Sequence, residues 1–376
     1  MKTTERTYLK GSVWLYRDEN GSFAEEYRIC SVIGEGGSSV CYEAARRLSD
    51  GGEETGKLKE FYPVDEAAGD GVWCESLKRL PDGQLIPEPG MDARFGRMCR
   101  DYLDTYRLLR NVMADHPENE VLKNYIQQGE ILYGYCGGRE GSAAEAGQKA
   151  TVYIWSPGVA GKGFDVYLKE VRENPAYRPE ERLRDILCVL DTLADCLKAM
   201  HTAGLLHMDV KPSNFLVPYN SDFQIQPGQV SLFDISTLCS VDHSCMAVSG
   251  TDGYCAPEVV RGRADNRSDI YSIGAMLFQA VVITEEIADG KYRDFYYQRI
   301  GQLVRHSALF LNSETNSDEA LMSRICRILE KCLARDPRKR YQSCSELRED
   351  LAKARKRLER LLCAPVGSGR DGVTDP

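Results

Sequence analysis

The sequence has no excess of positive charge and no apolar segment long enough to cross a membrane. Its 376 residues include 57 Asp and Glu against 48 Lys and Arg, which gives a formal net charge of −9. Proteins that bind nucleic acid or a membrane surface are usually basic, so this balance argues against both classes of partner. The longest apolar stretch, residues 270–283, is shorter than the roughly 20 residues that a spanning helix needs.

The 14 cysteines include no Cys-x-x-Cys pair. They are spread along the chain and do not follow the spacing of a disulfide framework or a structural metal site. The N-terminus is charged and has no apolar core typical of a signal peptide. We therefore interpret the cysteines as reduced, mostly buried thiols and expect a cytoplasmic protein.

The character of the chain changes near Pro157-Gly158. Strands are predicted at 12–16, 27–44 on either side of a glycine-rich turn, 57–61, 131–135 and 151–155. Helices are predicted at 92–113, 181–203, 269–282, 318–334 and 343–362. A strand-rich first part followed by a helical second part predicts an α+β protein with two lobes and a cleft between them.

The domain boundaries follow from the same patterns. We expect an N-terminal extension over 1–25, a β-rich lobe over 26–158, a helical lobe over 159–362 and a disordered tail over 363–376. Within the first lobe, residues 63–91 are interpreted as an insertion, with a hairpin about Pro81-Asp82-Gly83. Residues 137–150 are rich in glycine and alanine and are expected to form a mobile loop.

A short polar loop between two apolar runs, within residues 205–217, contains Asp209, Lys211 and Asn214. Phosphoryl transfer needs a group that accepts the proton of the attacking hydroxyl, a cation that steadies the phosphate and a ligand for magnesium. A carboxylate, an ammonium and a carboxamide at this spacing could supply all three.

This segment resembles the catalytic loop of the eukaryotic-like (Hanks-type) serine/threonine protein kinases, H-R-D-x-x-x-x-N. The resemblance implies that Asp209 is the base, Lys211 the phosphate-steadying cation and Asn214 a metal ligand. Met208 stands where the family has an arginine that meets a phosphate on the activation loop. Its presence weakens the expectation of switching by phosphorylation of that loop.

The turn over residues 33–40 is similar to the family's glycine-rich loop, G-x-G-x-x-G-x-V. Glycines let the backbone approach phosphates and offer N–H donors to them, although Ser39 replaces the third glycine. The resemblance implies nucleotide contacts from Ile33, Gly34, Glu35, Gly36, Gly37, Ser38 and Val40, and from the hinge at Ser156 and Gly158. A dinucleotide-binding loop, which needs a helix directly after the glycines, and a plain glycine hairpin are the other interpretations.

Lys59 is expected to grip the nucleotide phosphates from its strand, because Leu58 precedes it as an apolar residue does in the family's V-A-I-K. Lys57 lies on the same face of that strand and stays open as the alternative. The family pairs this lysine with a glutamate on the next helix, but residues 92–113 contain none. Asp101 or Asp104, three apart on one face, could substitute, or both could be solvated acids.

Asp234 stands 20 residues after Asn214, where the family has D-F-G. The resemblance implies that its carboxylate chelates the magnesium that bridges the phosphates. Ser236 occupies the place of the glycine, and this substitution is expected to stiffen the segment.

The segment Gly250–Glu258 matches G-T-x-G-Y-x-A-P-E, which seats a peptide substrate in serine/threonine kinases. The match implies that Thr251 bonds the catalytic aspartate and lysine. It also implies a buried pair between Glu258 and Arg340. Asp269, at the start of an apolar helix, is expected to brace the backbone of the catalytic loop, or to act only as a helix N-terminal charge.

The resemblance implies transfer of the γ-phosphate of ATP, with Mg²⁺ or Mn²⁺, to a serine or threonine of a protein substrate. The regulator is unknown. One alternative is a pseudokinase acting as a binding scaffold, favoured by the missing helix glutamate, Ser39, Met208 and Ser236. A second alternative is a small-molecule kinase, although that class lacks the peptide-seating segment.

Overall fold

The structure is a computed structural model that describes most of the chain. The described residues are 6–16, 24–36, 38–63, 77–80, 83–126, 129–135, 151–158, 161–221, 223–225, 230–241, 250–282, 299–307 and 318–363. The expected loop over 137–150, and the expected tail apart from Cys363, lie outside the described residues.

The chain divides into two compact units. The first comprises residues 1–115 and 127–160, and the second comprises 116–126 and 161–376. The first unit is rich in strands and the second in helices, so the fold is mixed α+β. Residues 116–126 were assigned to the strand-rich part from the sequence, but they belong to the second unit, where Ile126 forms a β-bridge with Leu232.

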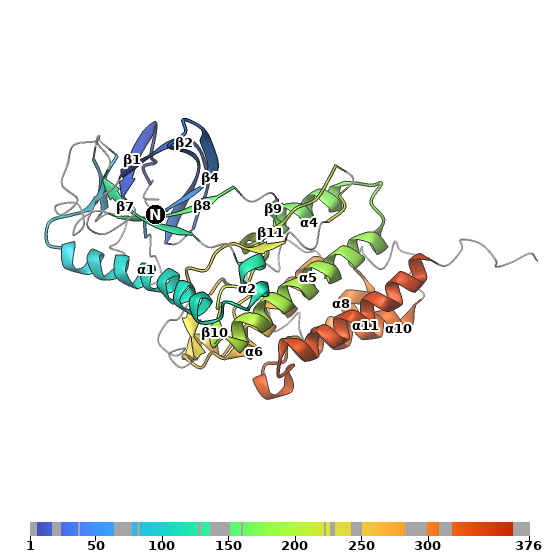
Figure 1. Ribbon diagram of the computed structural model, residues 1–376. Helices are drawn as coiled ribbons and strands as arrows, with labels where there is room; N and C mark the ends of the chain where they lie inside the picture. The colour runs from blue at the N-terminus through green and yellow to red at the C-terminus, as the bar shows by residue number, and fades with distance from the viewer. Residues whose placement is uncertain are drawn as a thin grey trace, which may run out of the picture. The chain divides into compact units, whose positions relative to one another are not determined.

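The core of the first unit is a closed barrel in the order β1-β2-β3-β4-β8-β7 (Figure 1). Its strands are β1 (Ser12–Tyr16), β2 (Ala24–Glu35), β3 (Ser39–Arg47), β4 (Glu53–Phe61), β7 (Glu130–Tyr135) and β8 (Val152–Pro157). All neighbours are antiparallel, and β1 pairs with both β2 and β7. Closure leaves no free edge in this sheet. These elements confirm the strands predicted in the first part of the chain.

Helix α1 (Asp92–Asp115) packs against the end of β4 through aromatic rings. The Phe61 ring centroid lies 4.6 Å from that of Tyr102 and 6.2 Å from that of Phe95. The predicted hairpin in the 63–91 segment is present as β5 (Leu77–Arg79) paired with β6 (Leu85–Pro87). Both short strands bury their leucine side chains.

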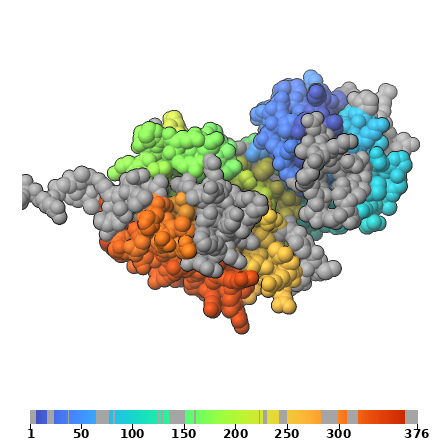
Figure 2. Space-filling model, turned by 180° about the vertical axis from the view of Figure 1, so that it is seen from behind, coloured from blue at the N-terminus to red at the C-terminus, as the bar shows by residue number. Residues whose placement is uncertain are grey.

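The second unit is built mainly on helices. They are α2 (Glu120–Tyr125), α4 (Phe164–Glu173), α5 (Pro179–Thr202), α6 (Asn266–Val282), α8 (Ile300–Arg305), α10 (Glu319–Cys332) and α11 (Cys344–Leu362). Helices α5 and α11 lie side by side in Figure 1. The orange and red segments with α10 and α11 form one continuous part of the surface in Figure 2. Helix α6 is apolar and almost entirely buried, as its sequence predicted.

Short strands and turns hold the loops of the second unit. One sheet has the order β12-β11-β9, and a second pairs β10 with β13. The elements are β9 (Lys162–Gly163), β10 (Leu205–Leu206), β11 (Phe215–Val217), β12 (Ser231–Leu232) and β13 (Cys239–Ser240), with the 3-10 turns η1 (Pro212–Asn214), η4 (Val259–Arg261) and η7 (Pro337–Lys339). Among the described helices, none is both long and apolar enough to cross a bilayer.

Candidate active site

One buried carboxylate, that of Asp269, holds the backbone of the loop between β10 and β11. Asp269, in the first turn of α6, is 1% exposed. Its oxygens accept the backbone N–H of His207 at 3.0 Å and of Met208 at 2.9 Å. Met208 has a φ of +71°, a left-handed conformation that costs a side-chain-bearing residue free energy. The two hydrogen bonds hold the backbone in this conformation.

His201, on α5, makes a third contact to the same carboxylate, with its Nε2 2.9 Å from Oδ2 of Asp269. Burial raises the pKa of Asp269, but the hydrogen bonds and charges of His201 and His207 outweigh it, so the pKa is lowered overall. Asp269 therefore stays ionised inside the unit and ties the backbone of the β10–β11 loop to two helices.

Thr251 joins the two charged residues of the loop. Its hydroxyl donates to Oδ1 of Asp209 at 2.6 Å and accepts from Nζ of Lys211 at 2.8 Å. The same Nζ lies 2.8 Å from Oδ2 of Asp209. The structure thus brings together three residues that lie up to 42 positions apart in the sequence, in the relationship that the motifs implied.

These contacts set the charge of Asp209. Burial raises the pKa of its carboxyl group. The positive charge of Lys211 and the hydrogen bonds from Lys211 and Thr251 lower that pKa by a larger amount, so it falls below its usual value. The side chain is 12% exposed, so a hydroxyl can still reach it. An ionised, oriented and accessible carboxylate suits a group that accepts a proton from an attacking hydroxyl.

A backbone hydrogen bond brings Asn214 close to Phe233, the residue that precedes Asp234. The N–H of Phe233 donates to the carbonyl oxygen of Asn214 at 2.9 Å, which places Asp234 directly after that contact. The amide nitrogen of Asn214 donates to Asp209 at its carbonyl oxygen, 2.9 Å, and at Oδ2, 3.1 Å. This orientation makes Oδ1 of Asn214 the end that can ligate a cation.

The donor set fits magnesium by chemistry, because carboxylate and amide oxygens are the ligands that this ion prefers. One oxygen of Asp234 accepts the N–H of Ser236 at 3.0 Å, which fixes the direction of its carboxylate. Within the described part of the chain, no three His, Cys, Asp or Glu side chains gather as a metal cluster. Any Mg²⁺ here would therefore rely on Asn214 and on phosphate oxygens as well as on Asp234.

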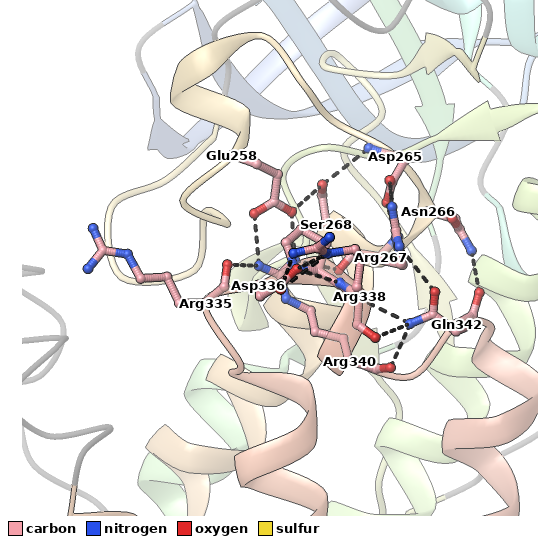
Figure 3. Close-up of polar contacts among 11 residues, drawn as sticks. Glu258, Asp265, Asn266, Arg267, Ser268, Arg335, Asp336, Arg338, Arg340 and Gln342 are labelled. Carbon is pink, nitrogen blue, oxygen red and sulfur yellow. Dashed lines mark hydrogen bonds and ion pairs between the residues drawn. The ribbon is translucent and has the colours of Figure 1, made fainter.

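Glu258 and Arg340 form a buried pair across 82 residues of sequence, as implied by the motif (Figure 3). The two carboxylate oxygens accept from the guanidinium at 2.6 and 2.8 Å. Arg340 is 1% exposed, and its remaining donors reach the carbonyl oxygens of Ala334 and Arg267. Ser268 adds a hydrogen bond to Glu258 at 2.8 Å. The pair anchors the 250–258 segment to the helical unit.

The glycine-rich turn belongs to the first unit. β2 ends at Glu35, and β3 begins at Ser39. A strand follows the glycines directly, so the dinucleotide-loop interpretation, which requires a helix there, is wrong. A Cβ atom added at Gly34 or Gly36 would meet nothing within 4 Å, and neither has a positive φ. Among the described residues, neither a packing contact nor a positive φ demands glycine at these two positions, and open space lies beside both.

The other residues expected to contact nucleotide lie around this turn. Ile33 is 51% exposed, whereas Val40 is fully buried. The carbonyl oxygen of Ser38 accepts the N–H of Tyr62 at 3.0 Å. Gly37 lies outside the described residues.

The strand lysines differ in their surroundings. Lys59 is buried, at 8% exposure, and lies opposite Cys41 and Ile154 in the barrel. Lys57 is half-buried, and burial lowers its pKa. Asp101 and Asp104 on α1 are both exposed. Asp104 pairs with Arg107 at 3.1 Å, so a partnership of either acid with Lys59 stays a prediction.

The expected hinge residues lie at the end of β8. Ser156 is buried and pairs in register with Lys57. The N–H of Gly158 donates to the carbonyl oxygen of Thr55 at 2.8 Å. A Cβ atom at Gly158 would lie 3.0 Å from that oxygen, so close contact with the backbone of Thr55 favours glycine there.

Sequence reasoning missed a buried acid next to Lys59. Glu60 is fully buried and accepts two hydrogen bonds from Arg79, at 3.0 and 2.7 Å. The hydroxyls of Tyr42 and Tyr153 also donate to it, at 2.8 and 2.9 Å. The available signal was a glutamate inside a buried strand, which requires a partner. The partner itself comes from the segment that had been interpreted as an insertion.

Comparison with known proteins supports the resemblance to protein kinases. The family model described as protein kinase domain matches residues 148–351, more than half of the chain. The match begins after the glycine-rich turn and Lys59. The assignment of those residues therefore depends on their own sequence and geometry.

Three curated relatives are similar to the chain. A probable serine/threonine-protein kinase of Streptomyces coelicolor is 29% identical over 180 residues, which cover 46% of this chain and 24% of that protein. The serine/threonine-protein kinase PknB of Mycobacterium tuberculosis is 28% identical over 168 residues, 44% of this chain and 26% of PknB. PknB of Mycolicibacterium smegmatis is 31% identical over 169 residues, with 43% and 25% covered. The chain thus aligns with about a quarter of the length of each relative.

Proposed function

Because the chain belongs to the Hanks-type serine/threonine protein kinase family, we propose that it transfers the γ-phosphate of ATP to a serine or threonine hydroxyl of a protein substrate. In this proposal the strand-rich and helical units are the two lobes of the protein kinase fold. The family generally uses ATP and Mg²⁺, and the acidic and amide side chains of this chain suit those partners.

The observation that carries the proposal is the contact of Thr251 with both Asp209 and Lys211. Thr251 belongs to the segment that resembles a peptide-seating loop, and the other two residues belong to the catalytic loop. A shared hydroxyl contact therefore ties the position of a bound peptide to the groups that act on its hydroxyl. This coupling favours a protein substrate over a small molecule.

Each residue then has a defined task. Asp209 accepts a hydrogen bond from the substrate hydroxyl and receives its proton as the new O–P bond forms and the bond between the γ-phosphate and the ADP leaving group breaks. Lys211 balances negative charge on the phosphate in transfer, and its ammonium is already oriented by Thr251. Asn214 and Asp234 would hold Mg²⁺, which when bound neutralises charge on the phosphates. The residues position and neutralise, as phosphoryl transfer requires.

The nucleotide-binding role is assigned to the first unit. Gly34 and Gly36 leave room for phosphates beside an open backbone, and Lys59 supplies a buried cation on β4. The hinge residues Ser156 and Gly158 are proposed to meet the adenine edge. A cytoplasmic location stays a prediction from composition.

A phosphotransfer assay with Asp209→Asn tests the proposal. Wild-type protein with radiolabelled ATP, Mg²⁺ and a generic basic protein should incorporate label on serine or threonine, identified by phosphoamino-acid analysis. Asp209→Asn keeps the size of the side chain and should lower incorporation by about 10³-fold or more, since it removes the proton acceptor. Binding of an ATP analogue should change little.

The two alternatives give different results in the same assay. A pseudokinase would bind nucleotide, or a partner, without transfer by the wild type. A small-molecule kinase would label an added amino sugar or alcohol and leave the protein unlabelled. Equal incorporation by wild type and Asp209→Asn would remove Asp209 from the mechanism.

A further inference from the structure

The outer half of β2 has almost no side-chain packing to fix its position. Residues 30–35 are all exposed, with Val32 at 42% and Ile33 at 51%. The register of β2 against β3 is also interrupted between Ile29 and Ser31 and again between Val32 and Gly34. Strand pairing alone therefore holds the glycine-rich turn loosely, because few buried contacts oppose local opening.

Arg6 supplies contacts that the turn itself lacks. Its guanidinium donates to the carbonyl oxygen of Gly36 at 2.7 Å and to that of Tyr62 at 2.8 Å. It also lies 3.3 Å from the carboxylate of Glu35. The side chain of Arg6 is only 6% exposed, and its guanidinium lies over the Tyr62 ring, 5.4 Å from the centroid. One cation thus links the tip of the turn to the end of β4.

The segment that carries Arg6 is itself anchored. The side chain of Arg79 donates to the carbonyl oxygen of Thr7 at 2.9 Å, and the N–H of Leu9 donates to the hydroxyl of Tyr42 at 3.2 Å. Leu9 is buried, at 3% exposure. Both anchoring side chains also bond the buried carboxylate of Glu60. The backbone of residues 6–11, called the leading segment below, is therefore bonded to two side chains that share a buried carboxylate.

We propose that Arg6 is a positioning residue that holds the glycine-rich turn in the conformation that receives nucleotide phosphates. The inference rests on the proposed function, because it assigns phosphates to that turn. A turn that is already ordered loses less conformational entropy when phosphates bind. Arg6 does this through Gly36, and it is not expected to contact the nucleotide.

The proposal predicts a loss of affinity confined to phosphate-bearing ligands. Arg6→Ala should weaken binding of Mg²⁺–adenylyl imidodiphosphate about tenfold, a change of about 1.4 kcal/mol, as measured by calorimetry. Binding of adenosine, which lacks phosphates, should stay within about twofold. In the transfer assay, KM for ATP should rise by a similar factor with a smaller change in kcat.

Three matched variants isolate the contact. Arg6→Lys keeps the charge but loses the forked geometry of the guanidinium, so its loss should be intermediate. Tyr8→Phe removes only the hydroxyl that donates to Glu35 at 3.4 Å and should have a small effect. Arg28→Ala breaks an exposed ion pair with Glu53 on the same barrel and should leave both affinities unchanged.

Amide hydrogen exchange supplies a readout that does not depend on nucleotide. In Arg6→Ala, exchange over residues 30–36 should become faster while exchange in α5 stays the same. If Arg6→Ala does not fold, Arg6→Lys and Arg6→Gln carry the test.

The inference and the proposed function fail in different ways. Absence of any binding of the ATP analogue by wild type would overturn the proposed function. Normal binding by wild type and the same affinity in Arg6→Ala would overturn the role of Arg6 alone. An equal loss for adenosine and for the triphosphate analogue would also overturn it, because it would indicate a general disturbance of the barrel.

Discussion

The guanidinium of Arg79 forms two hydrogen bonds with the carboxylate of Glu60, the residue that follows Lys59 on β4. Both side chains are nearly inaccessible, at 7% and 0% exposure. The pair is also connected to the leading segment, because Arg79 donates to the carbonyl oxygen of Thr7. Because Lys59 and Glu60 alternate across the strand, the pair fixes the strand from the side opposite to Lys59.

Arg79→Ala should therefore destabilise the protein. It leaves the carboxylate of Glu60 buried without its cation, a change that typically costs about 3–5 kcal/mol. The free energy of unfolding from urea titration measures the loss. Combining it with Glu60→Gln should recover part of the stability, since the remaining amide can still bond the hydroxyls of Tyr42 and Tyr153. No recovery in the double variant would contradict this account.

Asp269→Asn should destabilise the catalytic loop. The substitution replaces one carboxylate oxygen by an NH₂ group. This group then faces one of the three donors that surround the buried side chain, those of His201, His207 and Met208. The expected loss of stability is roughly 2–4 kcal/mol. Transfer activity should fall even at temperatures where the protein stays folded, because Met208 is no longer held at its left-handed φ. The control is Glu359→Gln near the end of α11, whose exposed carboxylate lies 3.6 Å from Arg355 and whose change should alter neither quantity.

Lys211→Met should shift the pH dependence of transfer. Lys211 holds the pKa of Asp209 low against burial, which raises it. Without the ammonium, the pKa of Asp209 rises, so the acid limb of the kcat/KM profile moves to higher pH. Wild type should retain ionised Asp209 to lower pH than the variant. Lys353→Met, which removes an exposed partner of Asp350 on α11, should leave the profile in place. A reversed shift would refute the assigned electrostatics.

Arg340→Ala should cost about 3–5 kcal/mol of stability, since it leaves the carboxylate of Glu258 buried without its cation. The matched control is Arg338→Ala, two residues earlier, whose side chain is 84% exposed and whose removal should not be measurable. Thermal unfolding followed by circular dichroism distinguishes the two. Loss of the pair should also loosen the 250–258 segment, detectable as faster amide exchange there. Equal melting temperatures for both variants would contradict the anchoring role.

Much of the fold could be predicted because the informative signals are local. Helix α5 was predicted from residue 181 and begins at Pro179; proline suits the first helical position, so it marked a start and not a break. Helix α4 was missed because its apolar residues are interleaved with charged ones over only three turns. Strand β12 covers only Ser231–Leu232, since the next N–H, that of Phe233, donates to Asn214 instead.

The contacts of the candidate site also divide into those that the sequence could predict and those that it could not. Thr251 and Asp209 could be linked from the sequence because each belongs to a motif with a fixed internal spacing. Arg6 and Arg79 belong to none. The partners described above lie 19 to 72 residues away, and the contacts arise only in the folded unit. The burial of Glu60 and the identity of its cation both depend on tertiary structure.

Closure of the barrel by β1 has a practical consequence for anyone who expresses a shortened version of this protein. A fragment trimmed to the family match would start at residue 148 and lack most of the sheet. A fragment that begins just before β2 would keep the motifs but leave β2 and β7 with unpaired backbone groups along their edges. Such edges recruit strands from other chains, so that product is expected to self-associate, and a poor yield from it would say nothing about the catalytic residues.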